Sequence, residues 1–123
     1  MQGKVGIFRE EKAMHEAVQE LAVLRERFKN VGVEDKGKRF NTDLMEAIEL
    51  GNLLDIAEIT AVAAVNRTES RGAHAHGDYP DRNDEEWRKH TFITRHDNGS
   101  YSIDYKPTVS LNKPEYAPKK RTY

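Results

Sequence analysis

Two stretches with the apolar spacing of helices, joined by a short polar connection, most strongly limit how this chain can fold. In residues 10–29 apolar side chains recur every three or four positions, as in a helix with one buried face. These apolar residues are Met14, Ala17, Val18, Leu21, Leu24 and Phe28. The charged residues between them, Arg25 included, are expected to face solvent. Because the connection over residues 30–41 is short, we expect the second helix to return antiparallel to the first.

The second stretch, residues 42–69, is apolar on two sides. Asn41, Thr42 and Asp43 are good capping residues, and Glu46 follows Asp43 at the spacing of a capping box. One apolar stripe contains Met45, Ile48, Ile56, Ile59 and Ala63, and a second contains Leu50, Leu54, Ala57, Ala61 and Val65. A helix with two apolar sides is expected to be the central helix of a small bundle.

A β-hairpin is predicted over residues 91–105. Two segments of alternating polarity flank the pair Asn98-Gly99, and this pair is the strongest short hairpin signal. A two-residue turn at this pair would place Phe92 opposite Tyr105 and both rings on one face. Since an isolated hairpin is marginal in water, we expect that face to pack on the helices or on a partner.

The remaining segments carry little periodicity. Residues 70–90 connect the second helix to the hairpin and allow only a short helical turn, capped by Asn83 or Asp84. Residues 106–123 contain Pro114 and Pro118 and are predicted to form an extended tail. The expected fold is therefore mainly α, with a small helical bundle followed by a β-hairpin and the tail.

Charge and composition exclude several classes of function. The 20 basic and 21 acidic residues give a formal net charge of -1, which argues against a nucleic-acid partner. No cysteine is present, which excludes disulfides, thiolate metal sites and a cysteine nucleophile. Without a run of about 18 apolar residues, direct membrane insertion is not expected. Because only 37% of the residues are hydrophobic and 33% are charged, the chain is expected to use a partner surface as well as its own core.

Most candidate functional residues fall within residues 66–91, where arginines, histidines and acidic residues surround the single tryptophan. His74, His76 and Asp78, with His90 further along, offer nitrogen and oxygen ligands for zinc. Their spacing matches no recognised zinc motif, so surface or interface histidines are the better interpretation.

An active site and a docking loop are two further interpretations of this segment. Glu69 or Asp78 could form a general acid–base pair with His74, although short polar loops commonly contain such pairs. Gly72 can take a positive φ after a helix end, and Arg71 offers fixed donors for carboxylate or carbonyl groups. We favour the docking loop, since a solvated loop has no physical need for so many ionic groups.

Several strings in this segment resemble the C-terminal helical domain of the succinate dehydrogenase and fumarate reductase flavoproteins. They are Glu69-Ser70-Arg71-Gly72-Ala73-His74-Ala75, Asp78-Tyr79-Pro80 and Trp87-Arg88-Lys89-His90-Thr91. The resemblance extends over nearly the whole chain, through residues 35–41 and 46–51 to the C-terminal Arg121-Thr122-Tyr123. The sequence departs from the family at His76-Gly77, where Arg-Glu is usual. The Glu-Ser-Arg-Gly string also resembles L-aspartate oxidase, but the match from Trp87 onward favours succinate dehydrogenase.

The resemblance implies spectrin-repeat-like antiparallel helices and a parent protein that oxidises succinate to fumarate on bound FAD. The parent would pass electrons to an iron-sulfur subunit and then to quinone, on the cytoplasmic side of a membrane. In the family the flavin and substrate residues precede the region matched by residue 1. No catalytic, cofactor-binding or metal-binding residue is therefore expected in residues 1–123, which we expect to bind no flavin alone.

The resemblance also suggests which residues dock this domain on the rest of its parent. Arg71, His74, Trp87 and His90 are expected to pack against the flavin-binding domain, with the acceptor of Arg71 across that boundary. Since the sequence lacks Gly-x-Gly-x-x-Gly and its start resembles an internal stretch of the family, we expect a fragment of a longer protein. The alternatives are the same domain of fumarate reductase or L-aspartate oxidase, and a free-standing interaction module.

Overall fold

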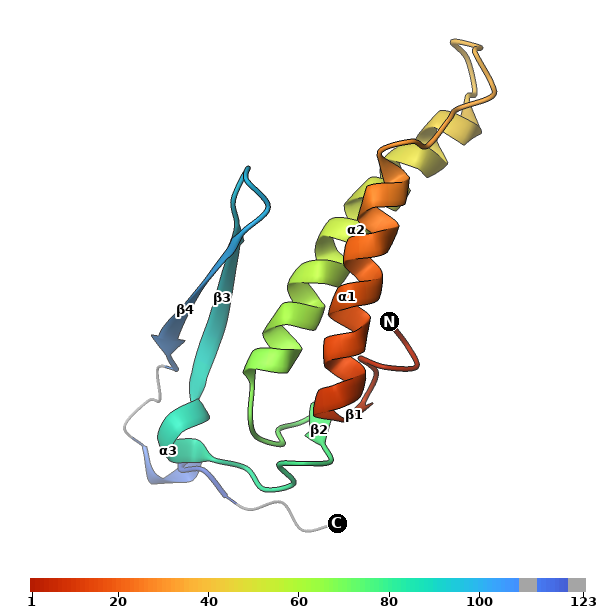
Figure 1. The fold of residues 1–123 in the computed structure, drawn as a ribbon. Helices are drawn as coiled ribbons and strands as arrows, with labels where there is room; N and C mark the ends of the chain where they lie inside the picture. Colours follow the sequence, from red (N-terminus) through yellow and green to blue (C-terminus); the bar gives the residue numbers. More distant parts are fainter. Residues whose placement is uncertain (109–112, 120–123) are drawn as a thin grey trace.

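The computed structural model describes residues 1–108 and 113–119. Two long helices lie side by side and antiparallel, and a β-hairpin packs against the second helix (Figure 1). The elements in chain order are β1 (Phe8–Arg9), α1 (Glu11–Phe28), α2 (Thr42–Asn66), β2 (Ala75–His76), α3 (Asp84–Trp87), β3 (Lys89–Arg95), β4 (Tyr101–Pro107) and the 3-10 turn η1 (Pro114–Tyr116). This arrangement confirms the expected class, a mainly α fold followed by a hairpin.

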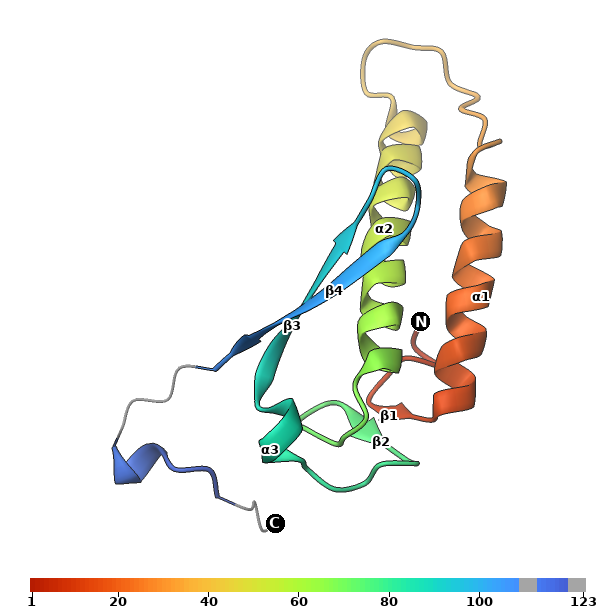
Figure 2. The same ribbon diagram turned by 60° about the vertical axis from the view of Figure 1, so that its left-hand side comes forward.

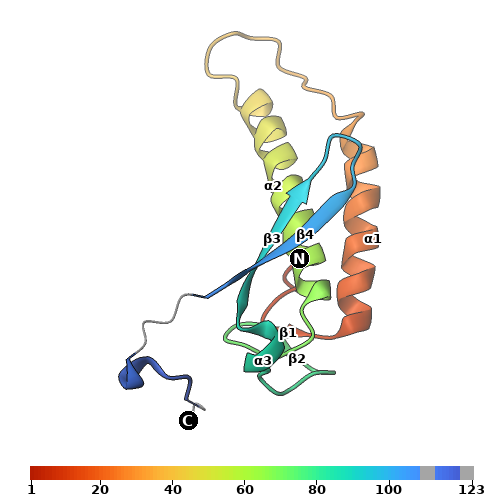
Figure 3. The same ribbon diagram turned by 90° about the vertical axis from the view of Figure 1, so that its left-hand side faces the viewer.

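Helix α1 buries most of the predicted apolar face against α2. Met14 is completely buried, and Ala17 and Leu21 are nearly so. They form one hydrophobic cluster with Leu54 and Ala61 of α2. Figure 2 and Figure 3 show the two helices side by side from two further directions. The core of the domain is therefore the seam between these helices.

Helix α2 begins as predicted and ends earlier than predicted. The Asn41 side chain accepts a hydrogen bond from the backbone amide of Leu44, at 2.8 Å, and so caps the helix. The last helical residue is Asn66, three residues before the expected end at 69. Arg67 already has an extended backbone, because its side chain and carbonyl are engaged by the segment that follows.

Only one of the two apolar sides of α2 is consistently covered. The side with Leu54 and Ala61 packs on α1, as expected. On the other side, Met45, Ile48 and Ile56 are 60%, 57% and 64% exposed. Burial on two sides was therefore a wrong expectation for this part of the helix, since the hairpin contacts α2 elsewhere and α1 covers one side only.

A buried carboxylate joins the helices to the hairpin. Glu58 of α2 accepts hydrogen bonds from Arg25 Nε of α1, at 2.6 Å, and from Tyr101 Oη of β4, at 3.0 Å. Arg95 of β3 approaches the same carboxylate at 3.8 Å. Arg25 is thus partly buried in an ion pair and does not face solvent as expected, because α1 packs beside Glu58.

The hairpin is present, but its register differs from the prediction by one residue. Phe92 lies opposite Asp104, and Ile93 lies opposite Ile103. The backbone amide of His96 donates to the carbonyl of Ser100, which leaves three residues in the loop instead of two.

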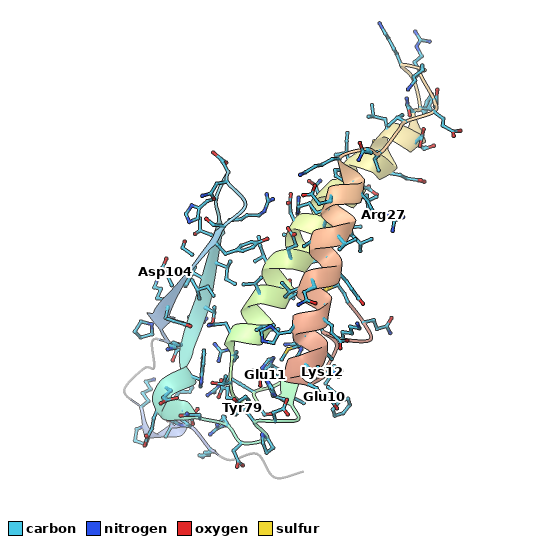
Figure 4. All side chains as sticks on the ribbon, viewed as in Figure 1. Glu10, Glu11, Lys12, Arg27, Tyr79 and Asp104 are labelled. Atoms are coloured by element: carbon cyan, nitrogen blue, oxygen red, sulfur yellow. The ribbon has the colours of Figure 1, made fainter. Side chains whose placement is uncertain are left out.

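The loop glycine explains the shift in register. Gly99 has φ of +82°, the left-handed conformation found at the last position of three-residue hairpin loops. A shift of one residue exchanges the two faces of a strand. Ile93 is half-buried as a result, while Phe92 is 51% exposed and pairs with Asp104, which points away from the helices in Figure 4.

The N-terminal residues contribute a pairing that local sequence patterns do not reveal. Strand β1 pairs in parallel with β2, with Phe8 beside Ala75 and Arg9 beside His76. Two backbone bonds hold them, from Ala75 to Ile7 and from Gly77 to Arg9. This pairing brings Arg9 to the segment that follows α2.

The C-terminal region contains the short turn η1 within the predicted tail. Residues 109–112 and 120–123, which include the family-like Arg121-Thr122-Tyr123 end, lie outside the described residues. Among the helices described, none is both long enough and apolar enough to cross a membrane.

Candidate functional site

A tight turn at residues 71–74 lies shortly after α2, within the predicted docking loop (residues 70–90). The backbone amide of Arg71 donates to the His74 carbonyl, at 2.8 Å, and the reverse bond measures 3.0 Å. Gly72 inside this turn has φ of +59°, a conformation that glycine adopts without steric cost. The positive φ was predicted for a helix end, but α2 ends earlier and the glycine serves the turn.

Glu69, immediately before the turn, is completely buried. Its carboxylate accepts hydrogen bonds from Arg67 Nη1 at 2.5 Å, Arg71 Nε at 2.8 Å and the backbone amide of Asn83 at 3.0 Å. A carboxylate removed from water is stable only with donors of this kind. Glu69 therefore ties together the end of α2, the turn and the cap of α3.

The same contacts keep Glu69 ionised. Burial on its own would raise the pKa of Glu69, but the hydrogen bonds from Arg71, the Asn83 amide and Arg67 outweigh it and lower that pKa below its ordinary value. The buried group is thus a fixed negative charge among arginines at neutral pH.

Arg71 finds both of its acidic partners inside the chain. It binds Glu69 through Nε, and its Nη2 donates to Asp84 Oδ1 at 2.7 Å. These bonds, that to Glu69 first, raise the pKa of Arg71 against the opposing effect of its burial. This pairing corrects the expectation that the acceptor of Arg71 lies in another domain, because the turn and α3 bring two carboxylates to it.

Arg67 connects the buried carboxylate to the hairpin. Besides Glu69, its guanidinium donates to the carbonyls of Trp87, at 3.0 Å, and Lys89, at 2.8 Å. It also lies 5.1 Å from the centre of the Trp87 ring, within the range of a cation–π contact. Arg67 thereby fixes the start of β3 next to the end of α2.

His74 is buried and held at both ring nitrogens. Nδ1 lies within hydrogen-bond distance of Arg9 Nη1, and Nε2 lies 3.0 Å from the Arg67 carbonyl. A guanidinium can only donate, so Nδ1 accepts and the proton resides on Nε2. Burial, reinforced by the charges of Arg9 and Arg67, lowers the pKa of His74 against the opposing bond to the Arg67 carbonyl. The ring is therefore a neutral structural contact.

A cleft of about 590 Å³ brings together all four predicted docking residues. Arg71, His74, Trp87 and His90 line it, between the C-terminal half of α2 and the start of β3. His90 is exposed, whereas His74 and Trp87 are buried walls of the cleft. The remaining cationic lining residues are Arg9, Arg67, Arg88 and Lys89. Docking by these residues stays a prediction at this point.

The candidate zinc ligands do not converge. His76 is 1% exposed, and its ring packs edge-on against Tyr79, with ring centres 4.9 Å apart. Its Nδ1 accepts from the Asp78 amide at 3.2 Å. His90, in contrast, lies in the cleft. Among residues 1–108 and 113–119, no three histidine or carboxylate side chains are placed to hold a metal ion.

The candidate acid–base pairs have other partners. The Glu69 carboxylate binds arginines and a backbone amide, and Asp78 accepts from the backbone amide of Glu11 at 2.9 Å. His74 binds Arg9 and a carbonyl instead of either carboxylate. These contacts hold elements of the domain together, and neither candidate pair forms.

Sequence reasoning missed Arg9 and Arg67 and did not recognise Glu69 as an internal charge. The placement of Glu69 midway between Arg67 and Arg71 is a signal that could have identified this ion cluster. No comparable local signal identifies Arg9, because it reaches His74 through a parallel pairing across 65 residues.

Replacing Arg71 by alanine should destabilise the 123-residue chain itself. The change removes two hydrogen bonds from the buried Glu69 carboxylate. We expect the free energy of unfolding to fall by about 1 to 3 kcal/mol, the usual cost of an unsatisfied buried polar group. Urea unfolding followed by circular dichroism measures this difference.

Arg82→Ala is the matched control for Arg71→Ala. Arg82 binds the same Asp84, at 2.9 Å, and makes no contact with Glu69. As a half-exposed ion pair without a fully buried partner, it should contribute less than about 1 kcal/mol. Equal losses in the two variants would show that Glu69 does not depend on Arg71.

The chain matches known proteins over its full length. The profile of a family described as "Fumarate reductase flavoprotein C-term" matches residues 1–123. The succinate dehydrogenase flavoprotein subunit of Rickettsia bellii is 42% identical over 127 residues, covering 100% of this chain and 21% of that protein. The fumarate reductase flavoprotein subunit of Haemophilus influenzae is also 42% identical, over 100% of this chain and 20% of that protein.

Solved structures of the same kinds of flavoprotein share the fold of this chain. A variant of E. coli quinol fumarate reductase superposes with a TM-score of 0.88 at 38% identity, covering 93% of this chain and 20% of that one. The Sdh1 complex of Mycobacterium smegmatis gives 0.80 at 32% identity, covering 94% and 20%. The chain thus spans about a fifth of the length of the relatives it matches. The chain belongs to the family of C-terminal domains of the fumarate reductase and succinate dehydrogenase flavoproteins.

Proposed function

We propose that this chain is the C-terminal domain of a succinate dehydrogenase flavoprotein subunit. The parent would oxidise succinate to fumarate with FAD and pass electrons to an iron-sulfur subunit and then to quinone. The observation that carries the proposal is the match over the whole chain to a succinate dehydrogenase flavoprotein subunit at 42% identity. As a peripheral part of a respiratory complex, the parent is proposed to lie on the cytoplasmic side of the membrane.

Fumarate reduction is the second candidate for the parent. The Haemophilus influenzae fumarate reductase subunit is equally identical to this chain, and the E. coli quinol fumarate reductase has the same fold here. Both candidates interconvert succinate and fumarate, so they differ in physiological direction and not in the role of this domain.

The residues of this chain do not fit a flavin site. The sequence has no Gly-x-Gly-x-x-Gly turn. In the part of the chain that the structure describes, the only parallel strands are the two-residue β1 and β2. The chain between them forms the antiparallel pair α1 and α2 instead of a single helix that starts at a glycine-rich turn and binds a pyrophosphate. We therefore assign no step of the reaction to these residues, and the flavin is proposed to bind elsewhere in the parent.

The proposed role of the domain is to pack against the flavin-binding part. Arg71, His74, Trp87 and His90 support this role because they line one cleft on one side of the domain. The first three are fixed by contacts within the chain, and they present a rigid surface. His90 is the exposed member and has the side chain most available to a partner.

Purification of the 123-residue chain and of the full flavoprotein tests the assignment. We expect the chain alone to carry no flavin absorbance and no activity, because it lacks the residues to bind the cofactor. The full flavoprotein should carry flavin and reduce a dye with succinate as donor. Stoichiometric flavin on the chain, or a full flavoprotein that oxidises L-aspartate but not succinate, would contradict the proposal.

His90→Ala tests the docking role separately from folding. Because His90 is exposed, its removal should change the unfolding free energy of the chain by less than about 0.5 kcal/mol. In the full flavoprotein the same variant should lower the thermal midpoint and accelerate proteolysis at the domain boundary. Identical behaviour of wild type and variant in the full protein would remove His90 from the docking surface.

A further inference from the structure

The cleft between α2 and β3 contains more positive charge than its own chain neutralises. Four arginines, one lysine and two histidines line it, and no aspartate or glutamate is among its described lining residues. Arg67 and Arg71 share the buried Glu69. The lining of the cleft is therefore basic, although Asp84, Glu85 and Glu86 of α3 line an adjoining pocket with Arg88 and Lys89. The chain as a whole has a formal charge of -1.

Three of these cations have no carboxylate partner among residues 1–108 and 113–119. Arg9 donates to the carbonyl of Gly6, at 2.7 Å, and to His74, which is neutral. Lys89 lies over the rings of Trp87 and Tyr105, at 4.8 and 3.8 Å from their centres. Arg88 is a half-buried residue of the cleft lining. Partly buried cations without counter-charges favour the approach of an anion.

The same cleft has an apolar part, which we call its floor. Its apolar lining residues are Ile59, Ala63, Ala64, Ile93 and the Trp87 ring. The indole N–H of Trp87 is buried and has no acceptor among the described residues. Because the Trp87 ring lines the cleft, the surroundings of this N–H should change when a partner binds there.

We propose that the cleft receives an acidic segment of the flavin-binding part of the same flavoprotein, with carboxylates on Arg9, Arg88 and Lys89 and apolar side chains on the floor. This inference rests on the proposed function for the identity of the occupant. A peptide segment suits the cleft better than a small anion, because the cations are spread over β1, the end of α2 and the α3–β3 junction. A small anion would bind one or two of them and leave the apolar floor in water.

The single tryptophan makes binding directly observable. The probe is a short peptide in which glutamates alternate with leucine and glycine, compared with its glutamine counterpart and with sodium succinate. We expect the glutamate peptide to shift the Trp87 indole resonance in ¹⁵N spectra of the 123-residue chain. Its affinity should fall as ionic strength rises from about 0.01 M to 0.15 M, because screening shortens the range of the charges.

Charge reversal at Arg88 locates the site. Arg88→Glu should weaken binding by roughly tenfold or more, which corresponds to ~1.4 kcal/mol. Arg88→Gln provides the milder change if reversal disturbs folding, which circular dichroism checks. Lys12→Glu is the matched control, since Lys12 is exposed near the start of α1, outside the cleft (Figure 4). Equal affinities of Arg88→Glu, Arg88→Gln and Lys12→Glu would overturn the proposal.

Two further comparisons test which kind of ligand the cleft binds and whether that ligand is the flavin-binding part. Succinate that shifts Trp87 as strongly as the glutamate peptide would show a small-anion site and overturn the proposed segment. In the full flavoprotein, Arg88→Glu should lower the thermal midpoint more than Lys12→Glu, and equal effects would exclude the flavin-binding part as occupant. If the full protein binds flavin and oxidises succinate but these tests give the contrary results, the proposed function stands and only the proposal for the cleft is wrong.

Discussion

The buried carboxylate of Glu69 is the constraint on which the region after α2 depends. It lies in the interior with no exposed surface and accepts hydrogen bonds from Arg67, Arg71 and the backbone of Asn83. Removal from water would be strongly unfavourable for this charge without those donors. The chain must therefore leave the helix after Asn66 and close the 71–74 turn in a way that returns the guanidinium of Arg71 to it. The geometry of the cleft follows from one internal ion cluster.

A second buried carboxylate, Glu58, attaches the hairpin and α1 to α2 in the same way. Glu58 joins α1, α2 and the hairpin through Arg25, Tyr101 and Arg95. Glu58 lies within α2 and Glu69 lies three residues after its last residue, Asn66, and each cluster attaches a neighbouring element to that helix. A chain with few apolar residues thus uses fixed charges where a larger core would use hydrophobic contacts. As a consequence, the described elements leave apolar surface of α2 exposed at Met45, Ile48 and Ile56.

Local patterns in the sequence predicted the elements and failed where distant residues meet. The helix periods, the Asn41 and Asn83 caps and the glycine turn at 99 depend on neighbours in the chain, and the structure confirms them. The hairpin register was wrong because loop length, which a single Asn-Gly pair does not determine, decides which face is buried. The four docking candidates were found from their residue types and from family resemblance, and the structure places them around one cleft. Arg9 was not found, because a parallel pairing across the chain leaves no periodic signal.

The pH dependence of stability tests the central role of Glu69 most directly. Its pKa is lowered in the folded state, so its contribution is present above the unfolded pKa of about 4.3 and is lost as pH falls through the folded value. The unfolding free energy of wild type should exceed that of Glu69→Gln at neutral pH, and the gap should close on acidification. Glu49→Gln, a change at an exposed position of α2, should leave the wild-type curve unchanged. Parallel curves for wild type and Glu69→Gln down to the acid limit would contradict the account.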